Sequence, residues 1–262
     1  MRSYRDIFPE DLRKKLPRAF DVVGDICIIK LPEELSPLRR DIGGAILKAY
    51  KHIKVVCVDK GVKGEQRVRD VEVIAGEKRT ETEHRENGCV YKLDIAQVYF
   101  SPRLSSERAR IASLVDKREI VWDMFCGAGP FTIPIAKRAE KVCASDINEK
   151  AMECLKENMK RNRVSNISVF CGNARDAFEG YEFDRIVMNL PHSSTDFLDC
   201  AFDKCRKGTI HLYKICNDPV AVSEIIAERA NAAGREMEGM KVKELHGYSV
   251  TEKLFCFDIV LK

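Results

Sequence analysis

Val121-Trp-Asp-Met-Phe-Cys-Gly-Ala-Gly-Pro-Phe131 is the stretch that decides the fold. It begins as a short apolar run typical of a β-strand, ends in a glycine-rich turn and passes into the helical pattern of residues 132–138. A second apolar run, residues 142–145, stops at Asp146. Strand, glycine turn, helix, strand and acid in this order are typical of the first half of a nucleotide-binding α/β sheet. We therefore expect a ligand site where these two strands end.

Two glycines and two acids in this region indicate the kind of ligand. Gly127 and Gly129 allow a sharp turn and a close approach of the backbone, which a Cβ would prevent. A dinucleotide-binding turn has a third glycine, whereas Gly129 is followed by Pro130 here. Asp123 would repel a pyrophosphate but suits a cationic amino-acid group, and Asp146 can accept hydrogen bonds from both hydroxyls of a ribose. The pattern predicts a site for S-adenosylmethionine, whose ammonium and sulfonium are both positive.

Composition bounds the class of protein without identifying a substrate. With 262 residues, 45% hydrophobic and 33% charged, the chain predicts a globular protein of one large domain or two smaller ones. It has no apolar run near the ~20 residues that cross a bilayer and no signal peptide, so we expect a cytoplasmic protein without a membrane partner. Eleven cysteines without a C-x-x-C pair, and five scattered histidines, predict no metal site. A net charge of +4 is compatible with a nucleic-acid partner but does not require one.

The order of patterns along the chain divides it into three parts. Residues 1–95 mix short strands, hairpins and helical spacing, which predicts a small α+β domain. Residues 96–118 form a connecting segment that contains a helix. From 119 to 262, strand and helix patterns alternate and two strand patterns close the chain. This predicts an α/β, Rossmann-like sheet of seven strands, wound on both faces and closed by a hairpin, which is the usual plan of S-adenosylmethionine-dependent methyltransferases.

Asn189-Leu-Pro191 follows the fourth predicted strand of this sheet, at the edge where open α/β sheets bind ligands. The Asn189 amide offers one acceptor and two donors, which can hold a planar group such as the edge of a base. Many nucleic-acid amino-methyltransferases have Asn-Pro-Pro and then an aromatic residue at this point. No aromatic residue follows here, so stacking of a target amine at this position is not predicted. The alternative is that Asn189 only caps the end of the strand.

Several motifs together resemble one family, the archaeal and eukaryotic tRNA (guanine-N1)-methyltransferases that act at position 37. They are residues 99–108, 123–131, 146–148 and 188–191, with residues 16–25 and 64–69 in the first part of the chain. The resemblance implies methyl transfer from S-adenosylmethionine to N1 of guanosine 37 in the anticodon loop of tRNA, by a monomer. Many archaeal members carry an additional N-terminal domain to which nothing here corresponds, so we expect a short form.

Two other functions stay open at this point. The aminocarboxypropyl transferase of wybutosine synthesis is a relative that shares the fold and the Ser-Pro-Arg segment, but the Asn-Leu-Pro signature favours methyl transfer. A non-catalytic RNA-binding member that keeps the pocket is the other alternative.

The resemblance also assigns catalytic roles. Guanine N1 carries a proton at neutral pH, so a base must remove it while a cation holds the charge that gathers on O6. By the resemblance Glu107 is the base, Arg67 is the O6 partner and Asn189 positions the guanine, with Arg69 as the alternative to Arg67. Such a base is most effective when partial burial raises its pKa toward neutrality. Otherwise, Glu107 is a first-turn residue that stabilises a helix dipole.

Cofactor contacts follow from the same resemblance. Asp146 is expected on the ribose, Gly127 near the methionine end, and Ile147 and Asn173 near the adenine, with Tyr99 and Phe100 covering the site. The full set of predicted cofactor-binding residues is Tyr99, Phe100, Asp123, Phe125, Gly127, Gly129, Asp146, Ile147, Asn148, Asn173, Asn189 and Pro191.

Overall fold

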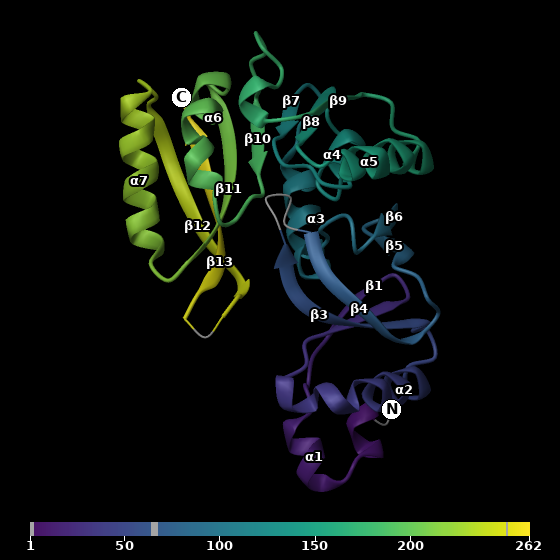
Figure 1. Cartoon of the computed structure of the whole chain (residues 1–262). Coiled ribbons are helices and arrows are strands. Elements are labelled where there is room, and N and C mark those ends of the chain that lie inside the picture. The colour runs from purple at the N-terminus through teal and green to yellow at the C-terminus, as the bar shows by residue number, and fades with distance from the viewer. Residues whose placement is uncertain (1–2, 64–67, 250) are drawn as a thin grey trace. The chain divides into compact units, whose positions relative to one another are not determined.

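A computed structural model describes residues 3–63, 68–249 and 251–262, and the chain divides into two compact units (Figure 1). Unit 1 is Met1–Ser105 and unit 2 is Ser106–Lys262. The division falls inside the predicted connecting segment 96–118. Within the described part of the chain, every helix falls short of the length and apolarity that a bilayer crossing needs.

Unit 1 is built on a four-stranded sheet of order β1-β2-β3-β4. Strands β2 and β3 are parallel, with α2 between them in sequence, and the other two pairs are antiparallel. Residues 35–50 have helical spacing in the sequence, but the segment begins as a 3-10 helix, in which Pro37 has no N–H to donate. The elements are η1 (Tyr4–Ile7), α1 (Glu10–Lys15), β1 (Asp21–Val23), β2 (Ile26–Ile29), η2 (Glu33–Leu38), α2 (Arg39–Ala49), β3 (Val55–Lys63), β4 (Val68–Gly76), the hairpin β5 (Glu81–Glu86) and β6 (Cys89–Asp94), and η3 (Pro102–Leu104).

Unit 2 contains the seven-stranded sheet that the sequence predicts, in the order β12-β13-β11-β10-β7-β8-β9. The last two strands, β12 and β13, form an antiparallel hairpin, and β13 is also antiparallel to β11. The elements are α3 (Ser105–Leu114), β7 (Ile120–Asp123), α4 (Thr132–Ala136), β8 (Lys141–Asp146), α5 (Glu149–Asn162), β9 (Ile167–Cys171), η4 (Ala174–Asp176), β10 (Arg185–Met188), η5 (Ser194–Phe197), α6 (Leu198–Lys204), β11 (Gly208–Cys216), α7 (Pro219–Ala232), β12 (Met237–Gly247) and β13 (Lys253–Leu261).

The strand order places a topological switch point between β7 and β10. From β7 the chain proceeds outward through β8 and β9, and it then returns to the other side of β7 as β10. Ligands of open α/β sheets bind outside the carboxyl ends of the strands at such a point. Asp123 ends β7, Asp146 ends β8, and Asn189 directly follows β10, so three predicted site residues lie at this edge.

The two faces of the sheet in unit 2 have different chemistry around β11 and β13. Leu212 and Phe257 are a cross-strand pair that belongs to the apolar core, together with buried residues of α6 and α7. The neighbouring pairs, His211 with Asp258 and Tyr213 with Cys256, must point to the opposite face because side chains alternate along a strand. Helix α3 contributes hydrogen bonds to this polar face. A buried polar layer therefore lies between α3 and the sheet.

Candidate active site

The glycine turn is held against the end of β8 by the Asp146 carboxylate. Its Oδ2 accepts from the Gly127 N–H at 2.7 Å and its Oδ1 accepts from the Asn148 N–H at 2.9 Å. Gly127 has φ +54° and Gly129 has φ +88°, in the left-handed region that favours glycine. A Cβ on Gly129 would lie 2.5 Å from Leu155 Cδ1, so α5 packs directly on the turn. The backbone of Ile147 also contacts the carboxylate, which keeps lone-pair capacity for a ribose hydroxyl.

Two buried oxygens at the switch point have no hydrogen-bond partner among the described residues. They are Oδ1 of Asp123 and Oδ1 of Asn189. Oδ2 of Asp123 accepts from the Thr132 hydroxyl at 2.6 Å. This contact fixes the orientation of the carboxyl group and leaves Oδ1 for a ligand. A buried acceptor without a donor is costly, so this pair suits a ligand that brings donors. The ammonium of S-adenosylmethionine is such a donor for Asp123, and the site fits it.

We expect the affinity for S-adenosylmethionine to depend on Asp123 and on pH. Burial raises the pKa of Asp123 to about 7. A cationic ligand favours the carboxylate, so affinity should rise as the pH passes upward through this value and level off above it. Below it, affinity should fall by up to about tenfold for each pH unit. Calorimetric titration over this range measures the effect.

Asp123→Asn is the matched control, because its amide oxygen can still accept from Thr132 while the group no longer titrates. It should bind more weakly and without this pH dependence. A wild-type affinity that is constant across the range would contradict the role of Asp123.

The loop after β10 is anchored from both sides. The Ser194 hydroxyl lies 2.7–3.1 Å from the carbonyl oxygens of Met188, Leu190 and Tyr213. The Pro191 carbonyl accepts from the Ile215 N–H at 3.0 Å. These contacts attach the Asn-Leu-Pro segment to β11 and hold the backbone that carries Asn189.

The remaining predicted cofactor residues of unit 2 have mixed surroundings. Ile147 is 49% exposed beside Asp146, which is unusual for isoleucine and suits an apolar ligand contact. The side chains of Asn148 and Asn173 accept from backbone N–H groups as helix N-caps, so part of their hydrogen-bonding capacity is already used. Phe125 packs edge-on against Phe197, with ring centroids 5.0 Å apart. These residues stay predictions as ligand contacts.

The predicted residues of unit 1 have partners inside that unit. Phe100 is buried, with its ring centroid 4.9 Å from that of His84, and the guanidinium of Arg69 lies 5.4 Å from the Tyr99 ring centroid. The same guanidinium pairs with Asp21 and Asp59 and donates to the Phe100 carbonyl. Arg69 is therefore engaged in holding unit 1 together, while its buried Nε has no partner among the described residues, and its role as the alternative O6 partner stays a prediction. Arg67 lies outside the described residues.

Glu107 belongs to α3, and its carboxylate lies in the polar layer between this helix and the sheet. The residue is 3% exposed. Its Oε1 accepts from Arg110 Nη2 at 2.6 Å and from the Tyr213 hydroxyl at 3.0 Å. Its Oε2 accepts from Arg110 Nε at 2.9 Å and from Lys243 Nζ at 3.1 Å. The Tyr213 ring in turn lies 5.4 Å from that of Phe131, which follows the glycine turn.

The pKa of Glu107 lies below the ordinary value of a glutamate. Burial raises it, but the hydrogen bonds and charges of Arg110 and Lys243 outweigh that effect, and the net result is a pKa below the ordinary value. The condition under which Glu107 would be most effective as a base, a pKa raised by burial, is therefore not met while these two cations are in place.

A chain of buried polar residues, which the sequence patterns did not reveal, continues from Arg110. The Arg110 guanidinium also binds both oxygens of Asp258, at 2.7 and 3.1 Å. Asp258 accepts from His211 Nδ1 at 2.6 Å, and Arg185 Nη1 lies 2.7 Å from His211 Nε2. These contacts fit a neutral imidazole, in agreement with the lowered pKa that burial gives His211. The Arg110 contact was accessible from sequence, because it lies three residues after Glu107 on one helix.

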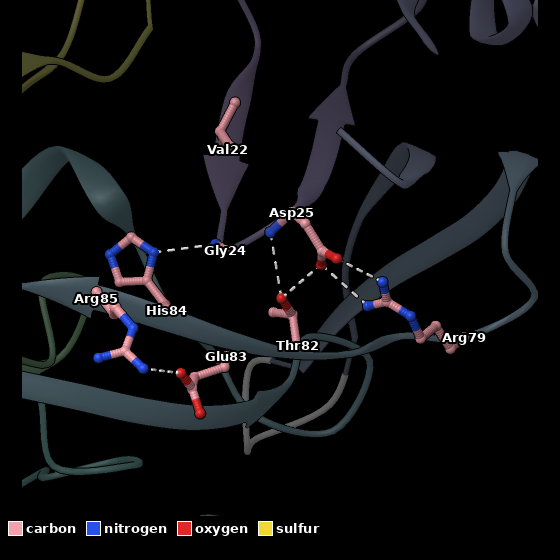
Figure 2. A pocket seen from close by; sticks show the side chains of 8 residues that line it. All are labelled: Val22, Gly24, Asp25, Arg79, Thr82, Glu83, His84 and Arg85. Atoms are coloured by element: carbon pink, nitrogen blue, oxygen red, sulfur yellow. Dashed lines mark hydrogen bonds and ion pairs between the residues drawn. The ribbon is translucent and has the colours of Figure 1, made fainter. Parts of the chain in front are cut away.

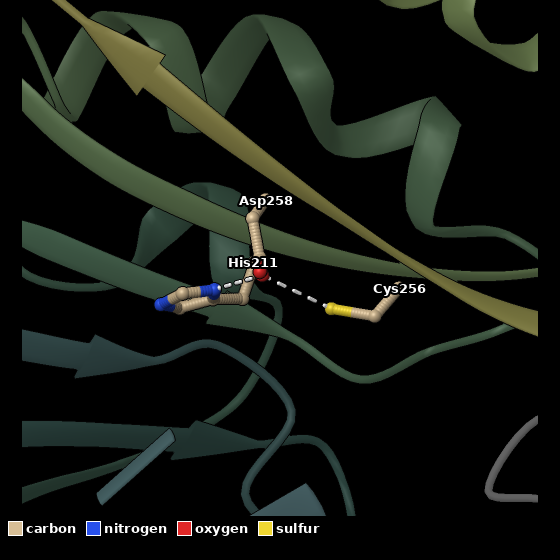
Figure 3. A group of neighbouring side chains, drawn as sticks. All are labelled: His211, Cys256 and Asp258. Carbon is tan, nitrogen blue, oxygen red and sulfur yellow. Dashed lines mark hydrogen bonds and ion pairs between the residues drawn. The ribbon is translucent and has the colours of Figure 1, made fainter. Parts of the chain in front are cut away.

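His211, Cys256 and Asp258 bring ligand-type atoms within 4.8 Å of one another (Figure 3). They do not suit a metal ion, because both imidazole nitrogens already have partners and Arg110 Nη2 lies 3.5 Å from the Cys256 sulfur. Burial also raises the pKa of the Cys256 thiol, whereas a metal needs the thiolate. We assign the three residues to the ion-pair chain.

A cavity of about 490 Å³ in unit 1 shares no residue with the predicted site (Figure 2). On its wall Asp25 pairs with Arg79 at 2.6 Å and accepts from the Thr82 hydroxyl, while His84 Nδ1 accepts from the Gly24 N–H. These contacts attach the β1–β2 turn to β5, so we interpret the polar wall as structural.

The fold and the switch-point geometry define an S-adenosylmethionine-dependent methyltransferase. A model of the TRM5/TYW2 methyltransferase domain matches residues 82–242, and a model of the TYW2 N-terminal domain matches residues 3–80. The chain belongs to the TRM5/TYW2 methyltransferase family.

Three relatives show the range of this family. The tRNA (guanine(37)-N(1))-methyltransferase Trm5b of Pyrococcus abyssi is 44% identical over 255 residues, which are 94% of this chain and 76% of that protein. A solved complex of aTrm5 and tRNALeu has a TM-score of 0.89 and 35% identity, and covers 100% of this chain and 78% of that one. The tRNA(Phe) (4-demethylwyosine(37)-C(7)) aminocarboxypropyltransferase of Methanocaldococcus jannaschii is 35% identical over 198 residues, 74% of this chain and 77% of that protein.

Proposed function

We propose that this protein transfers the methyl group of S-adenosylmethionine to N1 of guanosine 37 in tRNA. The observation that supports this most strongly is the buried, unpartnered Oδ1 of Asn189 at the switch point, beside the predicted cofactor position. The Watson–Crick edge of guanine presents an exocyclic amine beside the N1–H, and such an acceptor can bind the amine while the N1–H is left to Glu107. Adenine has no N–H at N1, so it cannot present this pair of donors.

The proposed chemistry requires one proton and one methyl group to move. When bound, S-adenosylmethionine supplies an electrophilic methyl group, and its sulfonium becomes a neutral thioether as the carbon–sulfur bond breaks. Glu107 accepts the N1 proton while N1 bonds to the methyl carbon. Asn189 orients the base, and Arg67 is proposed to donate to O6, where negative charge gathers. The product is neutral N1-methylguanosine with a protonated Glu107.

Aminocarboxypropyl transfer is the second candidate, and one observation favours it. Residues 3–80 match a model of the TYW2 N-terminal domain. The Asn-Leu-Pro segment and the greater identity of the methyltransferase relative favour methyl transfer.

Nucleoside mass analysis after incubation with S-adenosylmethionine and tRNA separates the candidates. We expect a methyl group on transcripts with guanosine 37 and no product on matched transcripts with adenosine 37. An aminocarboxypropyl adduct would support the second candidate, and a methyl group elsewhere than N1 of guanosine 37 would contradict the proposal.

We also propose that the enzyme works in the cytoplasm as a monomer. All eleven cysteines are free thiols, as expected in a reducing compartment where tRNA is modified. Native mass spectrometry tests the oligomeric state, and a stable dimer would contradict this part of the proposal.

A further inference from the structure

The Glu107 carboxylate already has a complete set of hydrogen-bond donors. An ionised carboxylate has about four lone-pair positions. The two positions on Oε1 face Arg110 and Tyr213, and the two on Oε2 face Arg110 and Lys243. A proton on guanine N1 can therefore reach this carboxylate only after one donor has left.

Two of the three donor residues are fixed. Arg110 binds Asp258 as well as Glu107, so its departure would leave buried Asp258 without a cation and Glu107 with Lys243 alone. Asp258 is itself held by His211 and by the Cys256 thiol. Tyr213 is fully buried, with its ring against Phe131 and its hydroxyl on Glu107.

Lys243 differs from them in exposure and in the number of its partners. Its side chain is 42% exposed, against 25% for Arg110. It lies on the edge strand β12, and Glu107 is the partner described for it in the structured part of the chain. A lysine ammonium on a flexible stem can move into solvent without leaving a second group unpaired.

The departure of Lys243 would change the net charge of the buried polar layer. The buried ion-pair chain contains three carboxylates and three cations, with neutral His211 between them. The pairs are Glu119 with Arg185, Asp258 with Arg110, and Glu107 with Arg110 and Lys243. Loss of Lys243 leaves one excess negative charge in a buried layer. A proton on Glu107 restores neutrality, so displacement of the lysine and uptake of the N1 proton compensate each other.

We propose that Lys243 is a positioning residue that closes the proton-accepting side of Glu107 in the free enzyme and is displaced by the N1–H of the incoming guanine. This rests on the proposed role of Glu107 in methyl transfer. Before tRNA arrives, the lysine keeps the carboxylate ionised. Once it has left, the same carboxylate is a stronger base, because one cation has gone and the burial remains. Base strength is thereby coupled to occupation of the target-base site.

The first test needs no turnover and is read on the Glu107 carboxyl carbon by ¹³C NMR, with the signal assigned by its loss in Glu107→Gln. In the free protein, Lys243→Met should move the Glu107 titration to higher pH, whereas Lys243→Arg should leave it close to wild type. Lys253→Met is the matched control, because Lys253 lies on the same hairpin and pairs at 2.9 Å with Glu244. An unchanged titration in Lys243→Met would overturn the proposal even if methyl transfer is established.

The second test separates the free enzyme from the complex by single-turnover kinetics with saturating S-adenosylmethionine. At subsaturating protein the acid limb of the pH profile reports the free enzyme, and at saturating protein it reports the tRNA complex. In Lys243→Met the first limb should move to higher pH, and the second should coincide with wild type. A shift of both limbs would mean that the lysine stays on Glu107 during transfer. A shift of neither, or of the second alone, would equally overturn the displacement.

A failure of the proposed function gives a different result. Wild-type protein would then form no N1-methylguanosine under any condition, while the NMR titrations of the free proteins would still report whether Lys243 controls Glu107.

Discussion

Glu107→Gln should reduce methyl transfer to guanosine 37 by at least about 10²-fold, because a glutamine amide cannot take up the N1 proton. The substitution keeps the size of the side chain, and its amide oxygen can still accept from Arg110 and Tyr213. Cofactor binding should survive, since no cofactor-binding role is proposed for Glu107. Single-turnover rates with saturating tRNA, together with calorimetric titration of S-adenosylmethionine, measure both parts.

The amide also places an NH₂ group near Arg110 or Lys243, so the fold of the variant needs its own check. Thermal unfolding and retained cofactor affinity provide it. Glu228→Gln, on the exposed side of α7, is the matched control and should turn over as wild type. Turnover in Glu107→Gln within a few-fold of wild type would remove Glu107 from the role of base.

Asp146→Asn should weaken binding of S-adenosylmethionine by about 10- to 100-fold. Both carboxylate oxygens accept from backbone N–H groups, of Gly127 and of Asn148, so one side of an amide must face a donor with its own NH₂. The glycine turn relieves such a donor–donor contact by moving away, and its return to the binding geometry costs on the order of 1–3 kcal/mol; tenfold in affinity corresponds to about 1.4 kcal/mol. Loss of an acceptor for the ribose hydroxyls acts in the same direction.

Calorimetric titration at a pH well above 7 measures this effect apart from the titration of Asp123. Asp176→Asn, on the exposed turn after β9, is the control and should bind normally. If Asp146→Asn binds the cofactor as tightly as wild type, Asp146 neither shapes the glycine turn nor meets the ribose.

The two variants separate the two halves of the proposed site. Asp146→Asn should lower transfer through cofactor affinity, so high cofactor concentration should restore much of the rate. No cofactor concentration should restore Glu107→Gln. A common response of both variants would indicate that the layer under α3 and the glycine turn do not act as separate parts.

Local sequence patterns were sufficient to predict the seven-stranded sheet and the cofactor. The glycine turn, Asp123 and Asp146 belong to one continuous strand-turn-helix-strand segment, so their mutual arrangement follows from short-range rules on strands, turns and glycine. Alternating strands and helices were likewise sufficient for the seven-stranded sheet. The residues at which helices begin were harder to predict from the sequence, as the 3-10 helix that contains Pro37 shows.

The surroundings of Glu107 could not be derived in the same way. Tyr213, Lys243 and Asp258 come from three different strands, and in the sequence they resemble ordinary polar positions of half-exposed strands. A sign of the buried polar layer was present in the alternation of His211, Tyr213, Cys256 and Asp258 with apolar residues. That sign does not tell which face α3 covers, or that this face is shielded from water.

The sequence by itself thus determined the class of fold, the cofactor and the set of acids and amides at the switch point, because these depend on residues close together along the chain. Only the tertiary structure decided the electrostatic state of Glu107. A pKa depends on every charge within a few ångströms, and here the two deciding cations are a helical neighbour, Arg110, and a lysine 136 residues away, Lys243.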